Sequence, residues 1–211
     1  MADNFTLYID SNHTSPYALF TYMALKEKGL PFDKVLINIR EKHHKLPQYQ
    51  SLSLTGKVPT LVQGDFALAE SSAIIEYLED AFPPPQHPAL LPRDLRHRAR
   101  ARQLQAWLRS SLLALREERP TTIFFDQKTQ VEAPLSEAAQ KDADKLIEVA
   151  QALVGDGLGY LFGDWSIADT ELALMLNRLL ANNDPVPETV NKYARNQWQR
   201  PSLQAWLRKQ P

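Results

Sequence analysis

Apolar and polar residues alternate in two short segments near the N-terminus, as they do in strands with one buried face. Residues 5–10 place their apolar side chains on one face, and residues 35–39 repeat the pattern. The segment between them begins at Pro16, stops before Gly29 and is apolar on almost every side, which is typical of a helix buried on both sides. The pattern therefore predicts a strand–helix–strand unit.

Turn-forming and proline-rich segments follow. Residues 60–68 predict a β-hairpin that turns at Gly64, and residues 71–82 have helical spacing. Residues 83–92 hold five of the fifteen prolines. Because proline cannot donate a backbone hydrogen bond, this stretch can form neither a continuous helix nor a central strand. We therefore expect a domain boundary there.

Helical spacing dominates the chain beyond this boundary. We expect a long helix from about Asp94, further helices over residues 136–154, 166–181 and 188–195, and a last one after Pro201. The long helix carries an apolar stripe made of Leu104, Trp107, Leu108, Leu112 and Leu115.

The order of these elements indicates the fold class. A length of 211 residues suits one large domain or two small ones. Strands gathered in the first part and helices in the second are typical of an α+β fold. We predict a first domain of residues 1–82, a linker of residues 83–92 and a helical domain of residues 93–211.

Charge and hydropathy limit the possible partners. The net charge is −1, so no excess of positive charge is available to bind nucleic acid. We interpret the five arginines between positions 93 and 102 as a solvated helix face or a dimer interface. The first residues lack the features of a signal peptide, and no apolar run is long enough for a membrane span. We therefore expect no nucleic acid, no membrane and a cytoplasmic location.

The chain contains no cysteine. This excludes disulfides, thiolate metal sites and a protein thiol that acts as nucleophile, and we expect no metal. If the protein performs thiol chemistry, the thiol must belong to a ligand.

Four motifs resemble those of one known family. They are Thr14-Ser15-Pro16-Tyr17, Lys57-Val58-Pro59-Thr60-Leu61, Glu70-Ser71 and Gly163-Asp164-Trp165-Ser166-Ile167-Ala168-Asp169. With them the chain resembles the glutathione transferases over essentially its whole length. Four blocks are most similar to the bacterial YfcF-type branch: RARARQLQAWLR, LREERPT, LFGDWSIADTELALMLNRL and QWQRPS. The resemblance implies a thioredoxin-like N-terminal domain that binds glutathione and an all-helical C-terminal domain.

The resemblance implies that a side chain near the start of the first helix contacts the glutathione sulfur. Ser15 is the predicted catalytic residue, with Thr14 and Tyr8 as alternatives. A helix N-terminus presents unpaired N–H groups and a partial positive charge, which favour a thiolate. Lowering a thiol pKa of about 8.5 by about two units requires about 2.7 kcal/mol, which the helix dipole and one hydroxyl hydrogen bond can supply. The other interpretation is that Ser15 only caps its helix.

Val58 and Pro59 form the second predicted contact. The resemblance implies that a cis peptide bond joins them and that the backbone of Val58 pairs with the cysteinyl part of glutathione, like a short added strand. Without the resemblance, Pro59 is an ordinary proline at the start of a strand.

Glu70 and Ser71 form the third predicted contact. Ser71 can cap the helix that follows and offer its N–H to the γ-glutamyl carboxylate, while Glu70 can accept the γ-glutamyl ammonium. The other interpretation of the pair is a plain N-cap.

The glycine carboxylate of glutathione needs a cation or a hydrogen-bond donor. His44 and Lys57 are the candidates, and His43 and Lys45 are weaker ones. Any of the four can equally belong to a solvated loop.

Two further features are interpreted as structural. Ser166 and Asp169 have the spacing of a capping box ahead of an apolar run. The family places the helix around Trp107 beside the second-substrate pocket. For the charged residues Arg109, Arg116, Glu117 and Arg119, buried ion pairs are an alternative to ligand contacts.

These implications describe a glutathione transferase. It activates the thiolate of its co-substrate glutathione for attack on a small electrophile, with glutathione-dependent peroxidase or disulfide-reductase activity open. A homodimer is expected, as is usual in the family. The alternative is a non-enzymatic interaction protein on the same fold, which would not be retained on immobilised glutathione.

Overall fold

A computed structural model of the chain describes residues 4–126, 129–157 and 159–209. The chain divides into two compact units, Met1–Leu90 with Ser202–Pro211 and Leu91–Pro201. This division differs from the expected domain bounds at both ends of the helical domain. Most of the proline-rich stretch groups with the first unit, and so do the residues after Pro201, although their helical pattern suggests the second.

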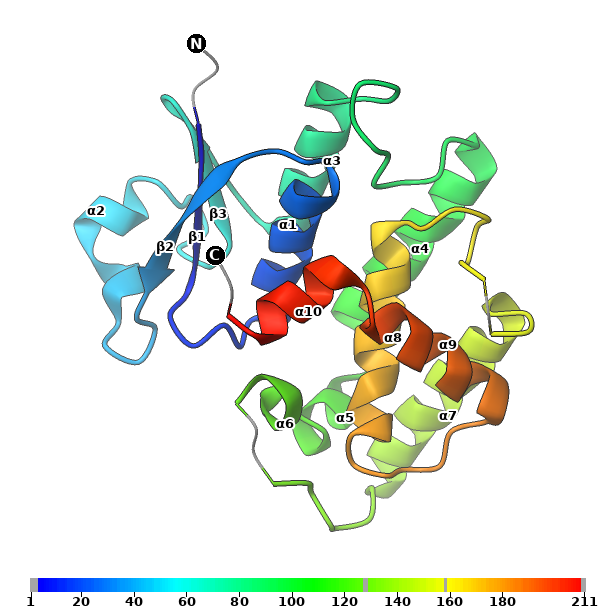
Figure 1. The fold of residues 1–211 in the computed structure, drawn as a ribbon. Helices are drawn as coiled ribbons and strands as arrows, with labels where there is room; N and C mark the ends of the chain where they lie inside the picture. Colours follow the sequence, from blue (N-terminus) through cyan, green and yellow to red (C-terminus); the bar gives the residue numbers. More distant parts are fainter. Residues whose placement is uncertain (1–3, 127–128, 158, 210–211) are drawn as a thin grey trace. The chain divides into compact units, whose positions relative to one another are not determined.

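The first unit is built on a four-stranded sheet (Figure 1). Its strands are β1 (Phe5–Asp10), β2 (Phe32–Ile37), β3 (Thr60–Gln63) and β4 (Phe66–Ala69), in the order β2-β1-β3-β4. β1 and β2 are parallel, whereas β1–β3 and β3–β4 are antiparallel. The parallel pair needs a crossover, which is α1 (Pro16–Glu27). The predicted strand–helix–strand unit and hairpin are thereby confirmed.

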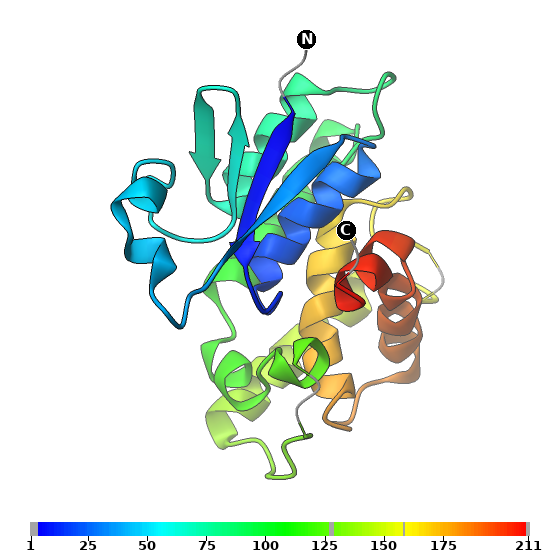
Figure 2. The ribbon, with the colours of Figure 1, turned by 60° about the vertical axis from the view of Figure 1, so that its left-hand side comes forward.

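Two helices cover one face of this sheet, and the short helix α2 (Pro47–Gln50) contacts the other. α1 and α3 (Ser71–Ala81) lie side by side on one face (Figure 2), and Leu7 and Ile9 are fully buried. Because side chains alternate along a strand, Tyr8 points to the opposite face. There its ring lies 5.9 Å from that of Tyr49 in α2, which follows the 3₁₀ turn η1 (His43–Lys45).

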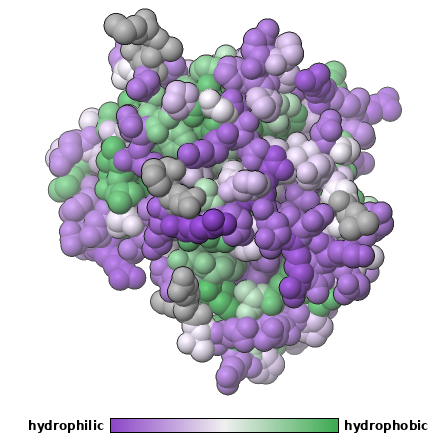
Figure 3. Space-filling model, viewed as in Figure 1, coloured by the Kyte–Doolittle hydropathy of each residue, from purple (hydrophilic) through white to green (hydrophobic). Residues whose placement is uncertain are grey.

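β2 differs from its prediction. The alternation was expected over residues 35–39, but the strand spans Phe32–Ile37 and lies at the edge of the sheet. Only Ile37 is buried, while Val35 and Leu36 are 37% and 52% exposed. An edge strand is covered on fewer sides, so its apolar residues are not all buried. Figure 3 shows apolar surface on the side of β2 and α2.

A buried ion pair joins α1, α3 and the proline-rich stretch. The Nζ of Lys28 lies 2.8 Å from Oε2 of Glu79, and the two side chains are 0% and 3% exposed. Lys28 also donates to the carbonyls of Phe82 and Pro88, and Glu79 accepts from the N–H of Leu90. A charge this deeply buried must keep its partners, so the pair holds residues 82–90 in place.

Helix α10 (Pro201–Leu207) supplies part of the core of the first unit. Trp206 is 1% exposed, and its ring lies 5.0 Å from that of His13 and 5.3 Å from that of Tyr22. Its Nε1–H donates to the carbonyl of His13. These contacts explain why the residues after Pro201 group with the sheet.

The second unit is helical. Its helices are α4 (Leu95–Ser110), α5 (Leu113–Glu118), α6 (Thr122–Phe125), α7 (Glu137–Leu153), α8 (Ile167–Leu180) and α9 (Glu188–Trp198). All but the last residue of α8 are buried, so α8 is the centre around which α4, α7 and α9 pack. Within the described ranges, no helix is long and apolar enough to cross a membrane.

The predicted long helix from Asp94 is interrupted. α4 ends at Ser110, and Leu112 has a left-handed backbone with φ of 61° before α5 begins. Arg116 of α5 donates to the carbonyls of Leu108 and Ser111, which the break leaves without helical partners. The apolar spacing continues across this break, because Leu112 and Leu115 are both buried, so the sequence pattern does not reveal where α4 ends.

Asp169 in the first turn of α8 joins four groups. Its Oδ2 accepts from the N–H and hydroxyl of Ser166, and its Oδ1 accepts from the N–H of Leu161 and the hydroxyl of Tyr193. The predicted capping box is present. Burial raises the pKa of Asp169, and burial together with this carboxylate raises the pKa of Tyr193 well above its usual value.

Replacing Asp169 by alanine should strongly destabilise the protein. The buried donors of Ser166 and Tyr193 and the partly buried N–H of Leu161 lose their acceptor, and each unpaired buried group costs about 1–3 kcal/mol. We expect the free energy of unfolding, measured by urea denaturation, to fall by at least about 2 kcal/mol. Glu137→Ala is the matched control, because Glu137 is exposed and its ion pair is with the exposed Lys141. Equal midpoints for Asp169→Ala and wild type would contradict this role.

Candidate functional site

The strand register brings three predicted site segments to one end of the sheet. Tyr8 of β1 lies opposite Thr60 of β3, and Thr60 lies opposite Ala69 of β4. Adjacent strands are about 4.8 Å apart. The start of α1, the Val58–Pro59 pair and the Glu70–Ser71 pair are each attached to one of these strands at that end (Figure 2).

Ser15 occupies the N-cap of α1. Its Oγ accepts from the N–H of Ala18 at 3.2 Å, so Ser15 caps the helix, and a cap of this kind leaves its hydroxyl proton available for a second role. The amides before it are also occupied. The N–H groups of Thr14 and Ser15 both donate to the carboxylate of Asp10, at 2.6 and 3.1 Å. The start of α1 therefore offers fewer unpaired N–H groups than the sequence suggested.

Sequence reasoning missed Asp10. The signal is the spacing of an aspartate four residues before a threonine in a turn, where a carboxylate bonds the backbone beyond it. Asp10 is 5% exposed, and its Oδ2 also accepts the hydroxyl of Thr14 at 2.8 Å. The hydroxyl of Thr14, the alternative to Ser15 in the prediction, therefore already donates a hydrogen bond to Asp10. The hydroxyl of Ser15 donates no hydrogen bond within the described residues.

The Val58–Pro59 peptide bond is cis, as predicted. The carbonyl of Lys57 just before it accepts three side-chain hydroxyls, from Tyr49 at 2.8 Å, Ser53 at 3.1 Å and Thr60 at 3.2 Å. Burial raises the pKa of Tyr49, so its hydroxyl stays protonated. Val58 is half-buried, and its own N–H and C=O make no hydrogen bond within the described part of the chain. They are positioned to pair with an added extended segment.

Glu70 and Ser71 depart from the predicted cap. Glu70, not Ser71, occupies the N-cap position of α3, and its side chain does not cap the helix. Ser71 is the first helical residue and is 2% exposed. Glu70 has φ of 71°, which costs a non-glycine residue about 1–3 kcal/mol. The strain holds an exposed carboxylate beside the first N–H groups of a helix, which is an arrangement suited to a zwitterion.

The four candidate cations lie on the connection after β2 and before β3. His44 is half-buried, and its Nδ1 is buried without a partner among the described residues. Lys57 has an exposed side chain, and Lys45 is also exposed. His43 lies 3.1 Å from Glu41, so it already has an acidic neighbour.

His13 is a second residue that the sequence did not indicate. It has φ of 58°, is 8% exposed, and neither ring nitrogen has a hydrogen-bond partner within the described residues. Burial, and to a smaller extent the charge of Lys34, lower the pKa of His13. The neutral ring packs on Trp206 and fixes the loop between β1 and α1.

The charged residues of the second unit form ion pairs. Arg109 pairs with the buried Glu171 at 2.6 Å, and Arg119 pairs with Asp184 at 2.6 Å. Burial raises the pKa of Glu171 despite this partner. Arg109 and Arg119 thus form the ion pairs that the sequence analysis gave as the alternative to ligand contacts.

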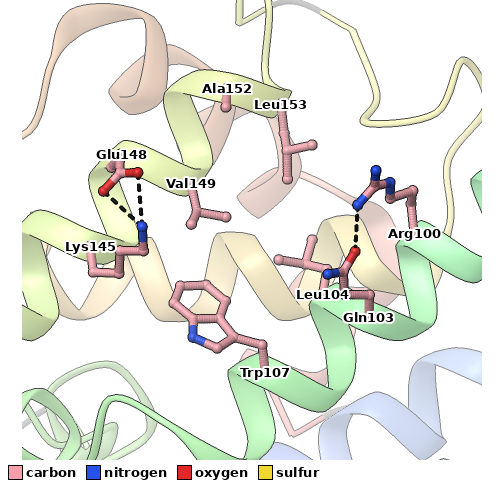
Figure 4. A pocket seen from close by; sticks show the side chains of 9 residues that line it. All are labelled: Arg100, Gln103, Leu104, Trp107, Lys145, Glu148, Val149, Ala152 and Leu153. Atoms are coloured by element: carbon pink, nitrogen blue, oxygen red, sulfur yellow. Dashed lines mark hydrogen bonds and ion pairs between the residues drawn. The ribbon is translucent and has the colours of Figure 1, made fainter.

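A groove of about 430 Å³ lies between α4 and α7 of the second unit (Figure 4). Trp107 points into it from α4, and Val149 and Leu153 face it from α7. Its rim carries both signs of charge. Glu148 pairs with Lys145 at 2.8 Å, while Arg100 donates to the neutral side chain of Gln103.

Comparison with known families covers both units. Residues 14–81 match the model of the glutathione S-transferase N-terminal domain. Residues 94–209 match the model of the glutathione S-transferase C-terminal domain.

Individual relatives agree with these matches. A glutathione transferase homolog from Burkholderia gl BGR1, solved with bound glutathione, is 42% identical, with a TM-score of 0.79 and coverage of 98% of this chain and 97% of that chain. Rat glutathione S-transferase theta-1 is 27% identical over 89% of this chain and 75% of its own length. Human glutathione S-transferase theta-2 is 36% identical over 41% of this chain. The match spans about a third of the length of the human protein.

Proposed function

Since the chain belongs to the glutathione S-transferase family, we propose that it is a glutathione transferase that binds glutathione at the end of the sheet where Ser15, Val58 and Glu70 gather. The observation that carries this proposal is the strand register, which attaches the three segments to adjacent strands at one end. The Burkholderia homolog with bound glutathione, similar over nearly its whole length, supports it.

Each part of glutathione has a proposed partner. Glu70 accepts the γ-glutamyl ammonium, and the N–H of Ser71 at the helix start receives the γ-glutamyl carboxylate. Val58, whose N–H and C=O make no hydrogen bond among the described residues, pairs with the cysteinyl backbone as an added strand would.

The glycine carboxylate is assigned to His44 and Lys57. Both lie on the connection that leads into β3, and both can supply hydrogen-bond donors. His44 has a buried Nδ1 without a partner among the described residues. Lys57 offers an exposed ammonium group on a residue whose carbonyl is held by three hydroxyls.

The proposed chemistry is thiolate attack. The hydroxyl of Ser15 donates to the glutathione sulfur, and the thiol proton passes to water. The thiolate then forms a bond to an electrophilic carbon, whose leaving group departs with the bonding pair. Binding both reactants also supplies proximity. Because the chain has no cysteine, peroxidase or disulfide-reductase activity would need thiols from glutathione alone.

Two broader assignments complete the proposal. The Burkholderia homolog is a bacterial relative, and this supports our assignment of the chain to the bacterial YfcF-type branch of the family. We place the protein in the cytoplasm because the cytosol maintains the reduced glutathione pool that the reaction consumes.

Ser15→Ala should raise the pKa of the bound glutathione thiol. A hydrogen bond to a charged group contributes about 1.5–3 kcal/mol, which corresponds to a shift of about one to two pH units. The shift is measured by titrating the ultraviolet absorbance of the thiolate in the complex. The pH at which kcat/KM reaches half of its maximum should increase by the same amount. Ser15→Thr retains a hydroxyl and should keep the wild-type pKa. An unchanged titration in Ser15→Ala would move the sulfur contact to Thr14 or Tyr8.

Glu70→Gln should weaken glutathione binding. The variant keeps the size of the side chain but loses the charge that faces the ammonium group. A lost charge-assisted contact predicts a rise of about tenfold to a hundredfold in Kd by calorimetry. Asp80→Asn, on the exposed side of α3, is the matched control and should bind as wild type does. A wild type that binds no glutathione at millimolar concentration would favour the non-enzymatic interaction protein.

We also propose that the protein is a homodimer in which a second copy of the chain covers the groove between α4 and α7. Trp107 is a large apolar side chain that faces this groove, and tryptophan is enriched in interfaces (Figure 4). A twofold axis places the same surface on both copies. The rim, with Arg100 and Glu148 both on it, can then pair opposite charges across the axis.

Trp107→Asp should therefore separate the copies. A charge in the groove loses apolar contact and must be desolvated, so sedimentation should show the 24.0 kDa monomer instead of a dimer. Leu113→Asp, at a 69% exposed position outside the groove, is the control and should remain dimeric. A wild-type protein that sediments as a monomer would refute the proposed homodimer, and the proposed glutathione site would be unaffected by that result.

A further inference from the structure

Asp10 ends β1 beside the start of α1, and its carboxylate is almost completely buried, at 5% exposure. It accepts three hydrogen bonds from two consecutive residues. Oδ2 accepts the N–H of Thr14 at 2.6 Å and its hydroxyl at 2.8 Å, and Oδ1 accepts the N–H of Ser15 at 3.1 Å. Hydrogen bonds to an ionised acceptor are about twice as strong as neutral ones. The loop before α1 is therefore tied to the end of the strand.

These bonds treat the two neighbouring hydroxyls differently. A hydroxyl has one proton to donate. The proton of Thr14 is directed at Asp10, whereas the Oγ of Ser15 accepts from Ala18 and its proton has no acceptor within the described residues. Of the two, only Ser15 can donate to an incoming ligand without breaking a bond.

We propose that Asp10 is a positioning residue that selects Ser15, rather than Thr14, as the donor to the glutathione sulfur. The inference rests on the proposed function, because it concerns the sulfur of that ligand. Asp10 acts by occupying the Thr14 hydroxyl. To donate to the thiolate, the Thr14 hydroxyl would have to break its hydrogen bond to the Asp10 carboxylate. Because both acceptors are anions, little free energy is gained by the change of partner. Without the carboxylate, Thr14 becomes a second available donor.

Asp10→Ala tests this selection. Both hydrogen bonds from Thr14 end on the same carboxylate oxygen, Oδ2, and alanine has no polar atom to accept them. The hydroxyl proton of Thr14 is then free to donate. The measured quantity is the increase in the pKa of bound glutathione caused by Ser15→Ala, determined in three backgrounds: wild type, Asp10→Ala, and Asp10→Ala with Thr14→Val.

The comparison within each background removes the direct effect of the lost charge on the thiol. We expect Ser15→Ala to raise the pKa by about one to two units in wild type. In Asp10→Ala the increase should fall to less than half, because Thr14 replaces the missing donor. Removing that hydroxyl with Thr14→Val should restore the full increase. A residue that only stabilised the fold would not produce this reversal.

Equal increases in all three backgrounds would overturn the inference while leaving the Ser15 assignment intact. Absence of glutathione binding to wild type, measured first by calorimetry, would instead overturn the proposed function and the inference with it. If Asp10→Ala does not fold, as judged by circular dichroism, the single variant Thr14→Val tests the inference instead. It should leave the pKa of the bound thiol unchanged, and a clear increase would show that Thr14 donates to sulfur and that Asp10 does not withhold it.

Discussion

The hydrogen-bonded register of β1, β3 and β4 is the constraint on which the candidate site depends. It pairs Leu7 with Leu61, which are both buried, and it sets Tyr8, Thr60 and Ala69 in one row. Side chains alternate with a period of two, so a slip of one residue would turn Leu61 from the core to the opposite face. The same slip would displace Val58–Pro59 from the start of α1. Core burial therefore fixes the positions of residues that are themselves outside the core.

Local bonds then fix each segment at this end of the sheet. Three hydroxyls hold the carbonyl of Lys57, a carboxylate holds the loop before Ser15, and a strained backbone holds Glu70. Polar groups that must meet a ligand at defined positions gain from such support, because little order has to be imposed when the ligand arrives. The strain at Glu70 is tolerated because the strand before it and the helix after it determine its backbone.

Sequence patterns predicted those features that depend on neighbouring residues. β1 and α1 were placed within a residue of their observed bounds, since alternation, Ser15 and Pro16 are local signals. The capping box needs only residues three apart, and it too was found. The break at Leu112 was missed because an apolar residue is buried equally well in a helix or in a turn between two helices.

Sequence patterns could not predict those features of the site that depend on contacts between residues with no shared local pattern. The sequence indicated Ser15 and Glu70 as candidates, but the state of their hydrogen bonds depends on Asp10 and on a backbone angle that no spacing reveals. The ion pair of Lys28 with Glu79 joins residues 51 positions apart in the chain, and neither residue has a local pattern that identifies its partner. Hydrophobic periodicity reports which face is buried, and it does not report which buried charges meet.

The place of α10 in the first unit has a consequence for the order of synthesis. The hydrogen bond from Trp206 to His13 closes a loop of 193 residues, so the sheet unit is discontinuous and the helical unit is inserted into it. A ribosome releases every residue of the helical unit before it releases Trp206. The sheet unit therefore lacks one part of its core until the whole helical unit has been synthesised, and the apolar surface around Tyr22 stays uncovered until then. During that interval this surface is open to chaperones and to aggregation.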